Sequence, residues 1–117
     1  MMKAFSVALL CLSTAAHAER MVTDTKMCEY SDPIDTQEMG TTLEPTSMFE
    51  IEYFCEFSPA IQFDWSSERV DTRIGHCSEP GFITPILVAF QFSPYEPGVV
   101  YAHFQGRDEP EVFMICH

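Results

Sequence analysis

The stretch from Glu79 to Gln105 decides the fold, and it reads EPGFITPILVAFQFSPYEPGVVYAHFQ. Its first Pro and Gly stand in the order that a type II turn favours, because Pro fixes φ and Gly accepts a positive φ. An apolar run, Phe82 to Phe92, follows directly, and a second run, Val99 to Gln105, begins after a loop rich in Pro and Gly. This arrangement predicts two neighbouring β-strands. Pro85 has no N–H to donate, which predicts a bulge, a bend or an edge at that position.

Alternating segments continue this pattern on both sides. From Met48 to Phe57 apolar residues alternate with glutamates in period two, which predicts the clearest strand in the chain. Like this strand, the segments from Ile61 to Trp65 and from Arg69 to Ile74 predict half-exposed antiparallel strands, and Val112 to Cys116 predicts the last strand. The apolar side is expected to hold Phe49, Ile51, Tyr53, Cys55 and Phe57 in the clearest strand, and Val70, Thr72 and Ile74 in the segment that starts at Arg69.

The region from Glu19 to Ser47 is polar, and it predicts one short strand near Met21 followed by a long loop. No segment after residue 18 has helical periodicity. Short strands separated by Pro/Gly turns, without helices, are typical of an all-β fold. We therefore expect a small antiparallel β-sandwich or barrel of about six to seven strands, stapled by disulfides.

The N-terminus has the features of a cleaved secretory signal peptide. Lys3 precedes an apolar run from Ala4 to Leu12, and Ala16 and Ala18 supply the small residues of a cleavage site. The run is too short to cross a bilayer, so no membrane anchor is expected. The predicted organisation is a signal peptide over 1–18, a polar segment over 19–47 and the β-strand core of one domain over 48–117.

Four cysteines remain after the predicted cleavage, and an even number in an oxidising compartment predicts two disulfides. If the strands run up and down in sequence order, Cys55 and Cys77 lie near one end of the sheet. Cys28 is then left for Cys116. The expected location is the periplasm or the extracellular medium. A bacterial source is favoured because the chain contains no Asn and so no acceptor for N-glycosylation.

The chain is strongly acidic. Without Lys3, the expected mature protein carries five Lys and Arg residues against eighteen Asp and Glu residues, a net charge of −13. Such a charge repels nucleic acids and anionic membrane surfaces. It favours a cationic protein partner. The alternative is that the acidity serves only to keep the protein soluble.

Two groups of residues are candidates for contact with a partner. Tyr95 lies between two prolines in a loop, where an amphipathic ring has little of its own domain to pack on. Glu50, Glu52 and Glu56 are expected to project from one face of the clearest strand. Together they predict a binding surface that combines an acidic face with a loop aromatic residue.

Metal binding is the alternative hypothesis. His76 and His117 each flank a cysteine, and with Glu79 they are the candidate zinc ligands. The acidic strand is the candidate calcium site, although no Asp-x-Asp-x-Asp-Gly loop accompanies it. Because adjacent His and Cys residues lack the usual zinc spacing, we expect disulfides in their place and no cofactor.

No catalytic motif is present in the sequence. The chain lacks the Gly-x-Ser-x-Gly nucleophile elbow, and its many carboxylates single out no catalytic pair. We therefore expect an exported, non-catalytic β domain that binds a cationic protein, as an inhibitor or an accessory subunit of that partner. A periplasmic metal-binding protein is the first alternative, and a small hydrolase is the second.

Overall fold

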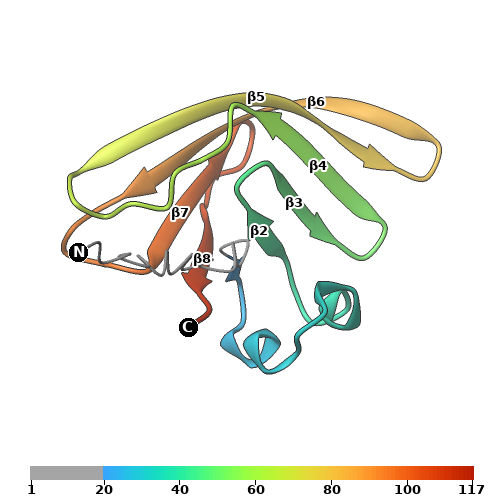
Figure 1. Ribbon diagram of the computed structural model, residues 1–117. Coiled ribbons are helices and arrows are strands. Elements are labelled where there is room, and N and C mark those ends of the chain that lie inside the picture. The colour runs from blue at the N-terminus through green and yellow to red at the C-terminus, as the bar shows by residue number, and fades with distance from the viewer. Residues whose placement is uncertain (1–19) are drawn as a thin grey trace, which may run out of the picture.

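The computed structural model describes residues 20–117, so the predicted signal peptide and its cleavage site lie outside the described residues. The chain forms a closed barrel of eight strands in sequence order, and every neighbouring pair is antiparallel (Figure 1). The all-β prediction is confirmed, with slightly more strands than expected. The elements are β1 (Met21–Val22), the 3-10 helices η1 (Thr25–Glu29) and η2 (Pro33–Thr36), β2 (Thr42–Glu44), β3 (Ser47–Glu50), β4 (Tyr53–Ser58), β5 (Arg69–Glu79), β6 (Phe82–Phe92), β7 (Val99–Phe104) and β8 (Glu111–Ile115).

The barrel is closed by the short strand β1, which lies between the second strand and the last one. Met21 is paired with Leu43 of β2 on one side and with Ile115 of β8 on the other. The predicted strand near Met21 is therefore confirmed. The region after it was expected to be a loop, but it also forms β2 and both 3-10 helices. Asp24 and Asp32 begin these helices, because each carboxylate accepts a hydrogen bond from a backbone N–H two residues later.

The clearest predicted strand is wrong in one respect, because the chain turns in its middle. Glu50 of β3 pairs with Tyr53 of β4 across a two-residue turn, and Glu52 there adopts a φ of 56°. The turn brings Met48 opposite Cys55, and both side chains are buried. Phe49 consequently points outward, against the prediction. The sequence concealed this turn because Glu52 occupies a left-handed position that Gly or Asn normally fills.

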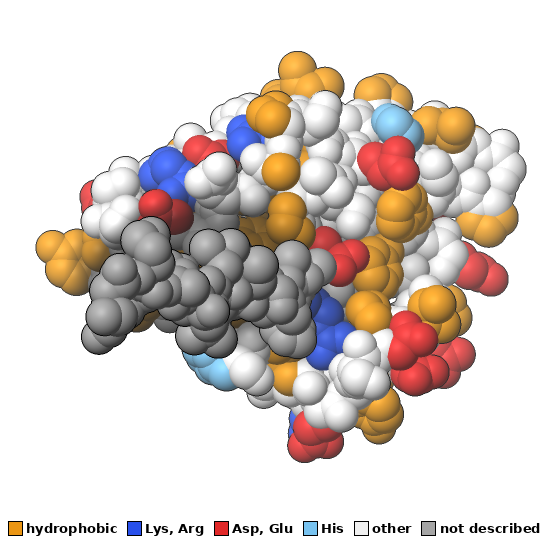
Figure 2. All heavy atoms as spheres, viewed as in Figure 1, with side chains coloured by type: hydrophobic (Ala, Val, Ile, Leu, Met, Phe, Trp, Pro, Cys, Tyr) orange, Lys and Arg blue, Asp and Glu red, His pale blue; other side chains and the backbone are white. Residues whose placement is uncertain are grey.

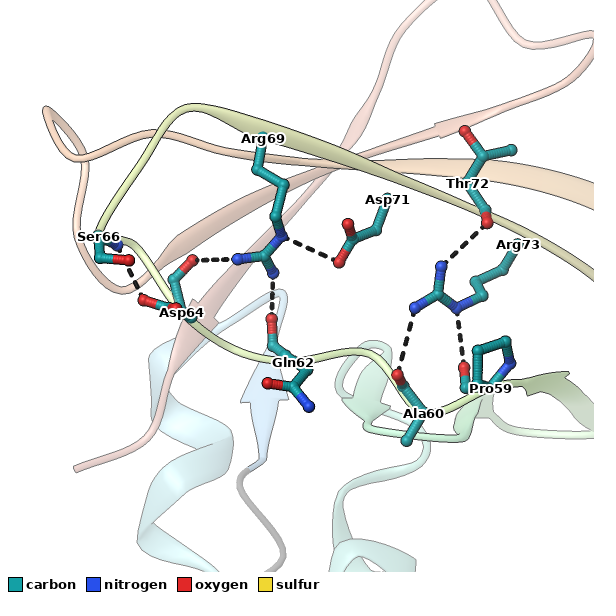
Figure 3. A network of polar contacts seen from close by, with 9 residues as sticks. All are labelled: Pro59, Ala60, Gln62, Asp64, Ser66, Arg69, Asp71, Thr72 and Arg73. Carbon is teal, nitrogen blue, oxygen red and sulfur yellow. Dashed lines mark hydrogen bonds and ion pairs between the residues drawn. The ribbon is translucent and has the colours of Figure 1, made fainter.

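The predicted strand from Ile61 to Trp65 is also wrong. The segment is extended but forms no ladder, although its inward and outward faces alternate as expected. Arginine side chains of β5 take the place of a neighbouring strand, because Arg69 and Arg73 donate hydrogen bonds to backbone carbonyls of residues 59–64. The accepting carbonyls belong to Pro59, Ala60, Gln62 and Asp64 (Figure 3).

This arginine network also reverses the expected faces of β5. Cys77 faces the core opposite Cys55, so the residues at even spacing from it point to the same side, including Arg69 and Arg73. Arg69 is held there by Asp71 at 3.0 Å and by contact with the Phe92 ring. The residues expected on the apolar side, Val70, Thr72 and Ile74, are instead exposed to solvent. The strand itself is confirmed, although it continues to Glu79 beyond the predicted end at Ile74, and its predicted apolar face is wrong.

The barrel interior is filled by apolar side chains from all eight strands. Phe90 is fully buried in it, with its ring 5.4 Å from that of Phe57 between centroids. Trp65 closes one end, where its indole N–H donates to the carbonyl of Val99 at 2.7 Å. A barrel of this size has room for side chains rather than for an open channel. Other core residues are Met21, Leu43, Met48, Val88, Phe92, Val100, Ala102 and Phe113.

Both predicted disulfides are present with the predicted connectivity. Cys55 and Cys77 are directly opposed on β4 and β5, and Cys28 of η1 is bonded to Cys116 just after β8. Among residues 20–117 no helix is long and apolar enough to span a membrane.

Pro85 lies at an edge, which is one of the three predicted positions. The carbonyl of Leu87 accepts a hydrogen bond from the N–H of Gln105, so Leu87 is oriented toward β7. Pro85, two residues earlier, is oriented the same way, but the pairing of β6 with β7 ends at Val88 and Phe104. The missing N–H therefore falls where the edge of β6 has no strand beside it.

A close approach between β4 and β5 predicts a strong effect of one small substitution. A Cβ atom on Gly75 would lie 2.1 Å from the carbonyl oxygen of Glu56, which belongs to backbone and cannot rotate away. We expect Gly75→Ala to lower the free energy of unfolding by about 2–3 kcal/mol, measured by urea denaturation. Gly106→Ala is a contrasting glycine substitution, because open space surrounds Gly106 and only its positive φ opposes the change. Equal stability of Gly75→Ala and the parent protein would contradict this prediction.

Candidate functional site

The outer surface of β4, β5 and β6 carries large apolar side chains that no described residue covers. We call this surface the outer apolar face, and its exposed fractions reach 73% at Ile74 and 69% at Ile83. Its members are Phe54, Val70, Ile74, Ile83 and Leu87.

Strand register places these residues in successive rows across the sheet. Ile74 of β5 is paired with Leu87 of β6. Ser78 of β5 is paired with Phe54 of β4 on one side and with Ile83 of β6 on the other. Orange side chains are accordingly spread over β4 and the β5–β6 hairpin, with red side chains between them (Figure 2). A row formed by Glu56, His76 and Pro85 lies between the Ile74–Leu87 pair and the row of Phe54, Ser78 and Ile83. Exposed apolar side chains that are bordered by polar residues in this way are typical of an interaction site.

Beside this face lies a hollow that we call the Phe54 cleft. It has a volume of about 440 Å³ and lies where η2, the β3–β4 turn and the β5–β6 turn meet. Ile34, Phe49 and Phe54 give it apolar walls, and the two phenylalanine rings lie 6.2 Å apart between centroids. Glu50 and Glu52 line it as well. The cleft therefore combines apolar walls with carboxylates.

The β3–β4 turn that forms one wall of the cleft is anchored to neighbouring segments. The N–H of Ile51 donates to the carbonyl of Gln37 at 3.1 Å, and the hydroxyl of Thr41 donates to a carboxylate oxygen of Glu50 at 3.2 Å. These bonds hold the turn against the end of η2. The wall is thus fixed by the fold without a ligand.

Tyr53 lies between the cleft and a neighbouring hollow, and its phenol reports the charge there. Burial raises the pKa of the Tyr53 hydroxyl, Arg107 lowers it, and the carboxylates of Glu79 and Glu50 raise it further, so that the pKa lies above its ordinary value. The guanidinium of Arg107 is placed over the Phe104 ring at 4.6 Å. Arg107 and the two carboxylates thus act on the Tyr53 phenol with opposite signs, and the effect of Arg107 is larger than that of either carboxylate.

Most basic side chains of the described chain are engaged elsewhere. Arg20 donates to two backbone carbonyls near η1, while Arg69 and Arg73 serve the 59–64 segment. Over residues 20–117 the ion pairs are Arg69 with Asp71 and His76 with Glu56. The remaining carboxylates of this part of the chain therefore have no cationic partner, and the outward field is negative.

The sequence-predicted contact residues do not form one site. Glu50 and Glu52 line the Phe54 cleft, and Glu56 lies on the outer surface beside His76 at 3.5 Å. The single acidic strand face does not exist, because the turn at Glu52 separates Glu50 from Glu56. Tyr95 is 86% exposed in the β6–β7 loop, at the barrel end opposite the β3–β4 turn.

The candidate zinc ligands are dispersed in the same way. Cys77 and Cys116 are bonded in separate disulfides, so neither offers a thiolate beside His76 or His117. In the part of the chain that the structure describes, no three His, Cys, Asp or Glu side chains are grouped to hold a metal ion.

The sequence did not identify Ile34, Phe54 or the outward residues of β5 and β6 as site residues. One signal was available, because the run from Phe82 to Phe92 is apolar on both faces, which requires cover on both sides or an exposed apolar surface.

No protein-family model, curated protein or solved structure matches the chain.

Proposed function

We propose that this protein is an exported, non-catalytic domain that binds a cationic protein, acting as its inhibitor or accessory subunit. The observation that carries the proposal is the outer apolar face, whose residues a partner would cover. Two disulfides and the leader-like N-terminus support a periplasmic or secreted location. A charge of −12 on the full chain favours a partner of opposite sign.

A heterologous partner suits this surface better than a second copy of the chain. Two copies would bring like charges together, and most of the described basic side chains are already bonded within the barrel. A basic protein gains from electrostatic attraction, which speeds encounter, and from burial of the exposed face against its own apolar residues.

The partner is expected to associate faster at low ionic strength. Affinity capture from the native envelope or medium at low salt supplies the partner, and surface plasmon resonance then measures both rates. Raising the salt from about 0.05 M to 0.3 M should slow association about tenfold, because the Debye length shrinks while buried contacts persist. An association rate indifferent to salt would mean that the acidity serves solubility alone.

The double variant Ile74→Ser with Leu87→Ser should raise the dissociation rate about 10–100-fold, since both side chains would be buried in the complex. Val112→Ser is the control, because Val112 is as exposed as Leu87, at 38% against 37%, but lies on β8. The effect of Tyr95→Ala on the dissociation rate tests whether the β6–β7 loop, at the other end of the barrel, contacts the partner. A larger effect of Tyr95→Ala than of the double variant would move the interface to the β6–β7 loop and contradict this assignment.

A further inference from the structure

The Phe54 cleft offers a basic side chain two complementary surfaces. Its walls at Ile34 and Phe54 are apolar and exposed, at 68% and 41% of their surface. Carboxylates of Glu50, Glu52 and Glu79 border the same hollow. A long basic side chain buries an aliphatic stem while its charged head stays near water and counter-charges, so this combination fits its two parts.

Arginine fits these surfaces better than lysine does. Its planar guanidinium stacks on aromatic rings and bonds a carboxylate with two parallel N–H groups, whereas the ammonium of lysine is a strongly hydrated point charge. The cleft supplies aromatic rings from Phe49, Tyr53 and Phe54 next to its carboxylates. At about 440 Å³ it is at the small end of ligand sites and has room for one or two side chains.

The cleft adjoins the surface on which the proposed function rests. Phe54 belongs to the outer apolar face and also lines the cleft, so a protein that covers the face reaches the cleft without a gap. No ion pair of residues 20–117 uses the cleft carboxylates. Arg107 lines the adjoining hollow with the same three carboxylates, but its guanidinium lies over the Phe104 ring and forms no ion pair with them. The carboxylates can therefore still pair with an incoming cation.

We propose that the Phe54 cleft receives an arginine side chain, with one apolar neighbour, from a surface loop of the basic protein partner. The assignment rests on the proposed function and specifies which chemistry of the partner is recognised. The arginine guanidinium would lie between Glu52 and Glu79, with its stem along Ile34 and Phe54.

The test uses the disulfide-bonded protein and short peptides, followed by ¹⁵N NMR. Acetyl-Leu-Arg-Leu-amide should shift the amide signals of Glu52, Phe54 and Glu79 with a dissociation constant on the order of millimolar. Acetyl-Leu-Gln-Leu-amide should bind at least about fivefold more weakly, since it lacks the charge. The lysine peptide should fall between them.

Paired variants separate the cleft from the general field of an acidic protein. Glu52→Gln with Glu79→Gln should weaken the arginine peptide about fivefold or more and leave the glutamine peptide unchanged. Glu29→Gln with Glu68→Gln removes the same charge from exposed positions outside the cleft and should have little effect. Equal weakening by both pairs, equal binding of the arginine and glutamine peptides, or absence of shifts at the cleft would overturn the assignment.

Dissociation rates of the captured partner distinguish failure of the cleft assignment from failure of the proposed function. If Glu52→Gln with Glu79→Gln leaves the dissociation rate of the captured partner unchanged while Ile74→Ser with Leu87→Ser raises it, the cleft assignment falls and the binding function stands. If no partner is captured at low salt, the proposed function falls, and the peptide titration still decides whether the cleft selects arginine.

Discussion

Replacing Cys28 and Cys116 together with alanine is expected to lower the free energy of unfolding by about 4–5 kcal/mol. The bridge closes a loop of 88 residues, and the chain-entropy model gives a cross-link of this length about 4.6 kcal/mol. A domain of this size has about 5–10 kcal/mol in total, so the double variant should be only marginally folded at 25 °C. Urea denaturation, monitored by tryptophan fluorescence, measures the loss.

The place of the damage is also predicted. Cys28 and Cys116 connect η1 to the end of β8, and the closing strand β1 has only two residues. In this variant the rate of amide hydrogen exchange at Met21 and Val22 should therefore rise more, relative to the parent protein, than the rate in β5 and β6. The variant Cys55→Ala with Cys77→Ala, which opens a loop of 22 residues, should leave the β1 amides protected relative to the rest of the barrel. An unchanged free energy of unfolding in Cys28→Ala with Cys116→Ala would mean that the core suffices without this bridge.

Phe90→Ala should destabilise the barrel by about 3–5 kcal/mol, because the ring is fully buried and its removal leaves a cavity. The thermal midpoint should fall by more than about 12 °C for a domain of this size. Differential scanning calorimetry checks the change. Phe82→Ala is the matched control, since Phe82 is 57% exposed at the end of the β5–β6 hairpin, and it should cost about 0.5 kcal/mol or less. Equal losses in both variants would contradict the packing described for the core.

The strand whose two ends the sequence located best is flanked by Gly and Pro. Phe82–Phe92 has its predicted bounds, because Gly81 before it has a positive φ and Pro94 follows soon after. The turn at Glu52 has no such marker, and its two flanking strands were merged into one. The short strand β2 was missed because three residues are too few for periodicity to be visible.

The candidate site was less predictable than the fold, for a physical reason. The face that a strand buries is decided by its neighbours, and on β5 the opposing Cys55 and the carbonyls near Ala60 turn Arg73 inward. Alternation alone assigns the apolar residues to the core, so Ile74 was placed on the wrong side. Glu50 and Glu52 were selected for their charge, and their role beside Phe54 depends on a turn that the sequence concealed.

The position of Pro85 bears on whether further copies of the chain can add strands at the unpaired edge of β6. An unpaired strand edge beside exposed apolar side chains is a template on which further copies of a chain add strands and grow into fibres. At Pro85 the edge of β6 lacks the N–H that such a copy would need, and the net charge of −12 on the full chain makes two copies repel each other. Both features oppose the addition of a second copy at this edge, while Ile83 and Leu87 beside it stay exposed to solvent.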